Sequence, residues 1–91
     1  MVNYNILSTI NKRKFYLVSI DGRYDDSGYY ELFPTYEDCE NYLNDLDFSF
    51  SATIYEYNLS LKDFNLVNRS VEEFLKNLYK FHSSSVLVAT L

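Results

Sequence analysis

The chain has 91 residues, of which 47% are hydrophobic and 23% are charged, and it carries a net charge of −5. A chain of this length predicts a single domain, residues 1–91, which buries about two-thirds of the surface that its unfolded form exposes. The composition excludes extensive disorder, and no apolar run approaches the ~18 residues of a membrane-spanning helix.

Residues 14–33 predict a β-hairpin. The segment KFYLVSI, residues 14–20, is β-branched and aromatic and is apolar on both faces, which is typical of an interior strand. The segment YYELF, residues 29–33, has the same character. Between these two strands, DDSG supplies turn-forming residues.

Residues 35–46 predict an amphipathic helix. Thr35 can cap its first turn, because Asp38 follows at the spacing of a capping box. Apolar residues then recur at intervals of three and four, as one face of a helix requires; they are Tyr36, Cys39, Leu43 and Leu46. This stripe predicts that the helix packs against a sheet.

Residues 51–61 predict a long strand. Its apolar phase changes between Ile54 and Tyr55, which indicates a bulge or a strong twist. A turn at residues 60–63 leads to FNLVN, residues 64–68, where we expect a short fifth segment of extended chain.

The remaining residues predict a second helix and a last strand. Ser70 and Glu73 form another capping box. The helix continues to about residue 81 along an apolar stripe that consists of Val71, Phe74, Leu75, Leu78 and Phe81. A polar break, SSS, separates it from VLVATL, which has the composition of a strand.

These elements predict an α+β fold, an antiparallel sheet of four to five strands with two helices packed on one face. An offset of 35 residues aligns Leu32 with Val67 and Thr35 with Ser70. The matches raise the hypothesis of two ββα units, although capped amphipathic helices resemble one another for physical reasons alone.

The sequence contains no motif that predicts a metal site or a catalytic centre. The segment DGRYDDSGYYELF, which begins at Asp21, fails as a calcium loop because Asp26 stands where glycine is needed and Leu32 where glutamate is needed. Cys39 and His82 are the only thiol and the only imidazole, too few for structural zinc. Cys39 is expected in the core and His82 at the end of the second helix, while their spacing leaves a catalytic pair open. We therefore expect no cofactor and no enzymatic activity.

Negative charge is concentrated in the middle of the chain, where residues 21–63 hold eleven acidic and two basic residues, a net charge of −9. In the second predicted helix, Glu72 and Glu73 lie in the first turn and Glu72 reaches Lys76 at i, i+4, so these charges have a structural explanation. The first predicted helix has acidic residues at both ends and no Lys or Arg; its acids are Glu37, Asp38, Glu40, Asp45 and Asp47. Its solvent face is thus more negative than helix stability explains.

The acids and the tyrosines near the hairpin turn predict a face that binds another protein. Tyrosine offers a large contact area with little entropy to lose, and carboxylates attract surfaces rich in Lys and Arg. Such a face repels a phosphate backbone, so we expect no direct nucleic-acid binding. The candidate partner-binding residues are Tyr24, Asp25, Asp26, Tyr29, Glu37, Glu40, Asp45 and Asp47.

The favoured hypothesis is a small, acidic, non-enzymatic binding protein that blocks the nucleic-acid-binding site of a basic partner protein. Small, acidic and rich in Tyr and Asn, the chain resembles in general character the inhibitors that phages and mobile elements encode, anti-CRISPR proteins among them. This resemblance is one of composition and implies no site residue. The alternative is a homodimeric regulatory or structural domain that pairs through its C-terminal strand, so both a monomer and a homodimer stay open.

The expected compartment is the cytoplasm. Cys39 has no partner for an internal disulfide, and the N-terminal residues lack the apolar core of a signal peptide. We expect no membrane contact.

Overall fold

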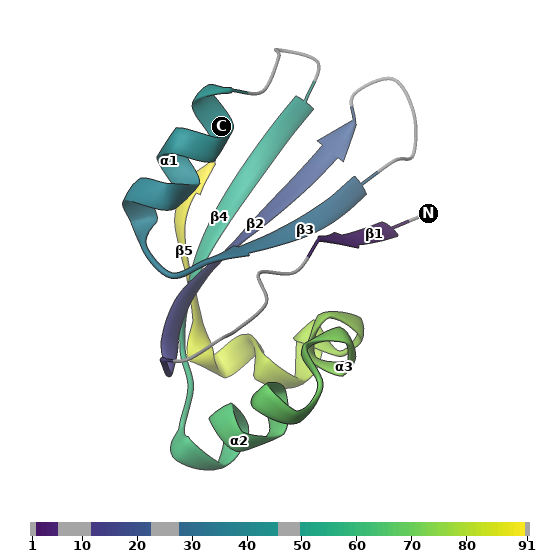
Figure 1. Cartoon of the computed structure of the whole chain (residues 1–91), viewed down its shortest axis with the longest axis vertical. Helices are drawn as coiled ribbons and strands as arrows, with labels where there is room; N and C mark the ends of the chain where they lie inside the picture. The colour runs from purple at the N-terminus through teal and green to yellow at the C-terminus, as the bar shows by residue number, and fades with distance from the viewer. Residues whose placement is uncertain (1, 6–11, 23–27, 46–49, 91) are drawn as a thin grey trace.

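The computed structural model of the protein describes residues 2–5, 12–22, 28–45 and 50–90 (Figure 1). Its five-stranded sheet has the strand order β1-β3-β2-β4-β5. The strands are β1 (Val2–Asn5), β2 (Lys14–Gly22), β3 (Gly28–Phe33), β4 (Phe50–Asn58) and β5 (Ser85–Thr90). β1 is parallel to β3, whereas the other neighbouring strands are antiparallel. The predicted α+β class is confirmed, and the predicted antiparallel arrangement is confirmed for the four strands β3, β2, β4 and β5.

The predicted hairpin forms the centre of the sheet. β2 pairs with β3, with Leu17 opposite Leu32, and on its other side with β4, with Val18 opposite Ile54. β1 has no counterpart among the predicted elements, because the four residues VNYN are too few to show an alternation.

A β-bulge lies between β4 and β5, as the change of apolar phase predicts. Ile54 lies opposite Ala89, but Tyr55 lies opposite Leu87, so Val88 has no partner residue in β4. A bulge of this kind bends the strand and increases its twist.

The described residues also form α1 (Tyr36–Asn44), α2 (Leu61–Arg69), α3 (Val71–Lys76) and a 3₁₀-helix, η1 (Leu78–Ser84). Each α-helix begins after a hydroxyl residue that caps it. The hydroxyl oxygen accepts a hydrogen bond of 3.2 Å from the backbone N–H three residues later, in the pairs Thr35 with Asp38, Ser60 with Asp63 and Ser70 with Glu73. These bonds satisfy N–H groups that the helix itself leaves without a partner.

The prediction of a turn and a short extended segment at residues 60–68 is wrong, because the helix α2 occupies this part of the chain. Phe64 and Val67 are three residues apart, which places both on one face of a helix but on opposite faces of a strand. Val67 is buried in the core and Phe64 packs against the same cluster. The cap at Ser60 therefore begins a helix that buries both side chains.

The second predicted helix, residues 71–81, is shorter than predicted. The α-helix α3 ends at residue 76, and the chain continues as the 3₁₀-helix η1. Asn77 interrupts the α-helix. Its side-chain amide donates to the carbonyl oxygen of Glu73 at 2.8 Å, and its backbone N–H donates to Phe74. A side chain that takes a backbone acceptor in this way competes with the regular helical hydrogen bonds.

The helices cover opposite faces of the sheet, so the prediction that both pack on one face is wrong. Neighbouring residues of β2 point to opposite sides, and both sides are buried. Leu17 belongs to a cluster with Phe74 of α3, and Val18 belongs to another with Cys39 of α1. We call these two sides the α3 face and the α1 face. Figure 1 shows α1 on one side of the twisted sheet and α2 and α3 on the other.

The hypothesis of two ββα units is wrong as well. The 35-residue offset aligns Leu32 with Val67, but Leu32 lies in β3 and Val67 lies in α2. Between α1 and α2 the described residues form one strand, β4, and no hairpin. The match reflects helix caps of the same kind at Thr35 and Ser70.

Candidate functional site

α1 lies with one side on the sheet and presents carboxylates on the other. Cys39 is fully buried, and Tyr42 and Leu43 pack against the same cluster. The acidic side chains of Glu37, Glu40 and Asp45 are exposed, and that of Asp38 is half-buried. We call Glu37, Asp38, Glu40 and Asp45 the acidic face.

A chain of hydrogen bonds holds α1 on β3. The hydroxyl oxygens of Tyr29 and Tyr42 lie 2.8 Å apart, and the Tyr42 hydroxyl donates to Oε1 of Glu31 at 3.5 Å. Burial raises the pKa of Tyr42, and its contacts with Tyr29 and Glu31 raise this pKa further. The ring of Tyr42 also packs on that of Phe33, with 5.2 Å between centroids.

A second set of contacts holds the start of α1. The rings of Tyr36 and Tyr16 meet edge to face, with centroids 5.9 Å apart. The Tyr16 hydroxyl donates to Oε2 of Glu56 at 3.0 Å, and Oε1 of Glu56 lies 3.7 Å from Nζ of Lys14. The carboxylate of Glu56 is thus compensated inside the molecule.

In the described part of the chain, the acidic face has no such compensation. The ion pairs found among the described residues join Lys14 to Glu56 and Lys76 to Glu72, and neither includes a residue of α1. The second pair confirms the i, i+4 contact predicted for α3. The last turn of α1 has no basic residue, and Asp45 stands at its C-cap. A carboxylate at the negative end of the helix dipole costs about 0.3–1 kcal/mol.

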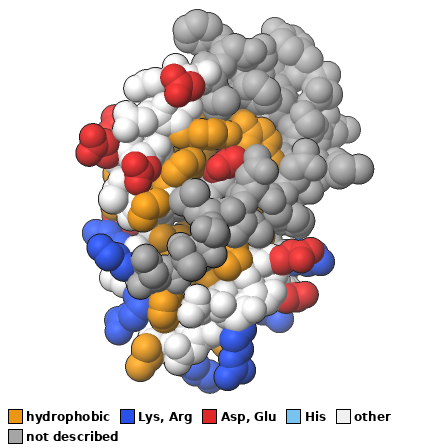
Figure 2. All heavy atoms as spheres, in the orientation of Figure 1, with side chains coloured by type: hydrophobic (Ala, Val, Ile, Leu, Met, Phe, Trp, Pro, Cys, Tyr) orange, Lys and Arg blue, Asp and Glu red, His pale blue; other side chains and the backbone are white. Residues whose placement is uncertain are grey.

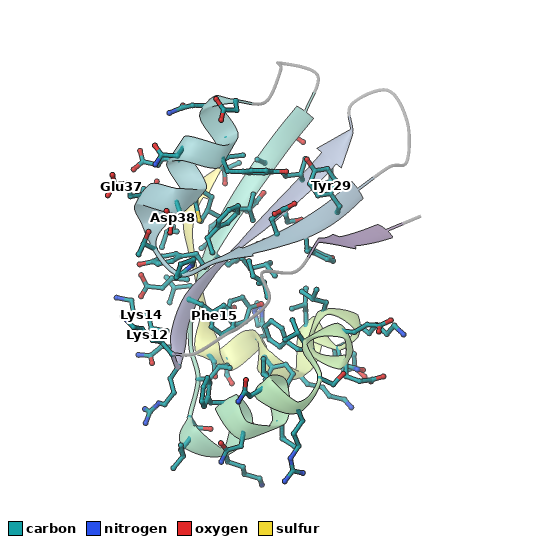
Figure 3. The ribbon with its side chains drawn as sticks, viewed as in Figure 1. Lys12, Lys14, Phe15, Tyr29, Glu37 and Asp38 are labelled. Carbon is teal, nitrogen blue, oxygen red and sulfur yellow. The ribbon has the colours of Figure 1, made fainter. Side chains whose placement is uncertain are left out.

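Charge is divided between the two ends of the molecule. In the part of the chain that the structure describes, the basic residues are Lys12, Arg13, Lys14, Lys62, Arg69, Lys76 and Lys80. Figure 2 shows acidic side chains around α1 in the upper part of the view, and the Lys and Arg side chains below, with further acidic side chains beside them. Figure 3 likewise places Glu37 and Asp38 on α1, above Lys12 and Lys14. The surface around α1 is therefore negatively charged.

The site is thus an acidic helix held at both ends on a sheet. No protein-family model, curated protein or solved structure matches this chain. Within the described ranges, no helix combines the length and the apolarity needed to cross a membrane. The same residues contain no group of three or more His, Cys, Asp or Glu that is placed to hold a metal ion.

The structure brings three predicted partner-binding residues, Glu37, Glu40 and Asp45, together on α1. Tyr29 has a different surrounding, because its side chain is half-buried and its hydroxyl is bound to Tyr42. Tyr29 therefore supports α1 from β3, and its contact with a partner stays a prediction. Four further predicted residues lie outside the described part of the chain: Tyr24, Asp25, Asp26 and Asp47.

Cys39 and His82 are separated by the sheet. Cys39 is buried on the α1 face, whereas His82 is exposed on η1 and lines a hollow on the α3 face. The catalytic pair that their spacing left open is therefore wrong. Burial raises the pKa of the Cys39 thiol to about 12, and the nearby Asp38 carboxylate adds to this effect. The thiol stays protonated at neutral pH and is a poor nucleophile.

The α3 face has hollows that correspond to no predicted site. One of about 220 Å³ is lined by Tyr30 and Tyr55, among others. Another of about 320 Å³ lies between α2 and α3, and its lining includes Leu66, Phe74 and Arg69. Sequence reasoning misses the second hollow because it depends on α2, which forms where an extended segment is predicted.

Proposed function

We propose that the protein is a small, non-enzymatic binding protein whose acidic face docks on a basic site of a partner protein. One observation carries this proposal: the carboxylates of α1 have no ion-pair partner among the described residues, and every described Lys and Arg lies outside α1. The burial of Cys39 and its separation from His82 support a role without catalysis.

The comparison of α1 with α3 supports a use for this charge outside the molecule. In α3, Glu72 and Glu73 lie at the positive start of the helix, and Lys76 lies in its last turn. These charges stabilise their own helix. In α1 the acids continue through Glu40 to Asp45, where they oppose the helix dipole. The charge of Asp45 is therefore retained at a cost to the stability of α1.

The anchoring of α1 supports a rigid docking surface. Tyr36 holds the start of the helix against Tyr16, and Tyr42 holds its second half against Tyr29 and Phe33. A helix fixed in this way loses little conformational freedom when it binds, so more of the interaction energy contributes to affinity.

The partner that we propose is a nucleic-acid-binding protein. A groove that binds phosphates is positively charged, and a row of carboxylates on an exposed helix is electrostatically complementary to it. The same carboxylates repel nucleic acid, so the protein competes with nucleic acid for the groove. In this role it acts in the cytoplasm as an inhibitor of the kind that phages and mobile elements encode, anti-CRISPR proteins among them.

Affinity capture from a cell lysate with three baits tests this proposal. The baits are the wild-type protein, an acidic-face variant (Glu37→Gln, Glu40→Gln, Asp45→Asn) and a control with the same change of charge at other helix positions (Asp63→Asn, Glu72→Gln, Glu73→Gln). The wild type and the control should capture the same nucleic-acid-binding protein, and the acidic-face variant should not.

The captured partner is then purified, and its binding to nucleic acid is measured in the presence of each protein. The wild type and the control should displace the nucleic acid, whereas the acidic-face variant should leave it bound. Equal capture by all three baits contradicts docking through α1. Stoichiometric binding without displacement of nucleic acid contradicts the inhibitory role and leaves the docking in place.

A further inference from the structure

β5 is an edge strand with exposed apolar side chains. Among the described strands, only β4 pairs with it. The side chains of Val86, Leu87 and Val88 are 61%, 56% and 40% exposed. An edge strand presents backbone N–H and C=O groups that a further strand can bind.

This edge has little protection against pairing. Natural edge strands are shielded by charged side chains, by proline or by bulges. β5, SVLVAT, contains no charged residue and no proline, and the bulge at Val88 is the one protective device found among the described residues. An uncharged strand of this composition suits the addition of another strand.

We propose that β5 pairs antiparallel with β5 of a second copy of the chain, across a two-fold axis at Leu87. The strand is self-complementary about this residue, because Val86 then lies opposite Val88 of the second copy and Ser85 lies opposite its Ala89. A two-fold interface brings residues close to their own copies, so a charged strand would repel itself. β5 has no charge and pairs small or apolar residues with one another.

The division of charge favours the antiparallel arrangement. Ser85 pairs with Tyr57, at the end of the sheet where β2 begins with Lys14. Ala89, at the other end of β5, packs against the cluster that contains Cys39 of α1. The two-fold axis reverses the second copy, so the basic end of each copy lies beside the acidic end of the other. Parallel pairing would bring like charges together.

This dimer does not depend on the proposed function, because β5 and the acidic face are different surfaces. Sedimentation over a range of protein concentrations and at low and high salt tests it. The wild type should show a monomer–dimer equilibrium that weakens with added salt, as complementary exposed charges require. Leu87→Lys should raise the dissociation constant about tenfold or more, since it places two like charges at the axis. Leu61→Lys is the matched control, because Leu61 is 61% exposed on α2, and it should leave the equilibrium unchanged.

Oxidative cross-linking tests the position of the axis. Leu87→Cys should form a disulfide-linked dimer, because antiparallel partners at the axis lie within reach of a disulfide. Leu61→Cys should form no disulfide-linked dimer under the same conditions, and the native Cys39 is buried and does not compete. Circular dichroism confirms that each variant is folded. A single monomeric species at every concentration and salt, or a dimer that Leu87→Lys leaves intact, overturns the proposal.

Discussion

The hydroxyl oxygens of Tyr29 and Tyr42 lie 2.8 Å apart, so a hydrogen bond joins β3 to α1 across the α1 face. Tyr42→Phe removes this bond and the one to Glu31 while it keeps the ring that packs on Phe33. We expect the free energy of unfolding to fall by about 0.5–1.5 kcal/mol, as measured by chemical denaturation. Tyr79→Phe is the control, because Tyr79 is 74% exposed and its loss should be below about 0.5 kcal/mol. Equal losses in the two variants would show that the Tyr29–Tyr42 contact adds no stability.

Stability should also decrease at alkaline pH. The pKa of Tyr42 is raised above its ordinary value of 10.0, chiefly by burial. Because this pKa is higher in the folded state than in the unfolded state, the contribution of Tyr42 is complete below about pH 10 and is lost as the pH rises toward the folded-state pKa. Thermal unfolding between about pH 9 and about pH 12 should therefore show a steeper fall for the wild type than for Tyr42→Phe. Identical profiles would contradict the role of Tyr42.

Cys39 should be unreactive as long as the protein is folded. Its side chain is 0% exposed, and burial raises the pKa of its thiol to about 12. A thiol reagent at neutral pH should label the chain only after a denaturant is added. Cys39→Ser should reduce the free energy of unfolding by roughly 1–3 kcal/mol, because it places a hydroxyl in an apolar cluster, and should leave partner binding intact. Loss of binding in a folded Cys39→Ser variant would return the thiol to the functional site.

Asp45→Lys should change stability and binding in opposite directions. A cation at the C-cap of α1 favours the helix dipole, so we expect a gain of about 0.3–1 kcal/mol in the free energy of unfolding. Partner binding should weaken, mainly through a lower association rate, and the wild-type rate should fall with added salt. Glu37→Lys, in the first turn, should weaken binding and also reduce stability. An Asp45→Lys variant that binds as tightly as the wild type at low salt would remove Asp45 from the docking surface.

The local elements are largely predictable from the sequence. The strands β2 and β3, the caps at Thr35 and Ser70 and the bulge beside Ile54 all follow from residue types at fixed spacings. The cap at Ser60 was available as a signal too, because Asp63 follows it at the spacing of a capping box and Phe64 and Val67 continue on one helix face. The five-residue run FNLVN is short enough to fit a strand or a helix. Taken without the cap before it, the run favours a strand, whereas the structure has a helix.

The arrangement in space was less predictable. The apolar character of both sides of β2 already indicates cover on two faces, and the placement of both helices on one face contradicts that pattern. For the candidate site, the excess of acid on α1 is readable from Glu40 and Asp45. The support that Tyr29 and Glu31 give to Tyr42 cannot be predicted from the sequence, because it depends on contacts between separate elements. The separation of Cys39 from His82 could not be predicted either, because it depends on which face of the sheet each element covers.

The burial of Leu17 and Val18 in two different clusters also has a consequence for how the chain unfolds. β2 supports the two helical layers of the molecule. The layer that contains α3 packs on Leu17, and the layer that contains α1 packs on Val18. Removing either layer would expose an apolar side of the same strand to water and weaken the pairing that holds the other. The two layers should therefore be lost together, in one cooperative transition, and a fragment that ends after β4 should not persist as a folded unit.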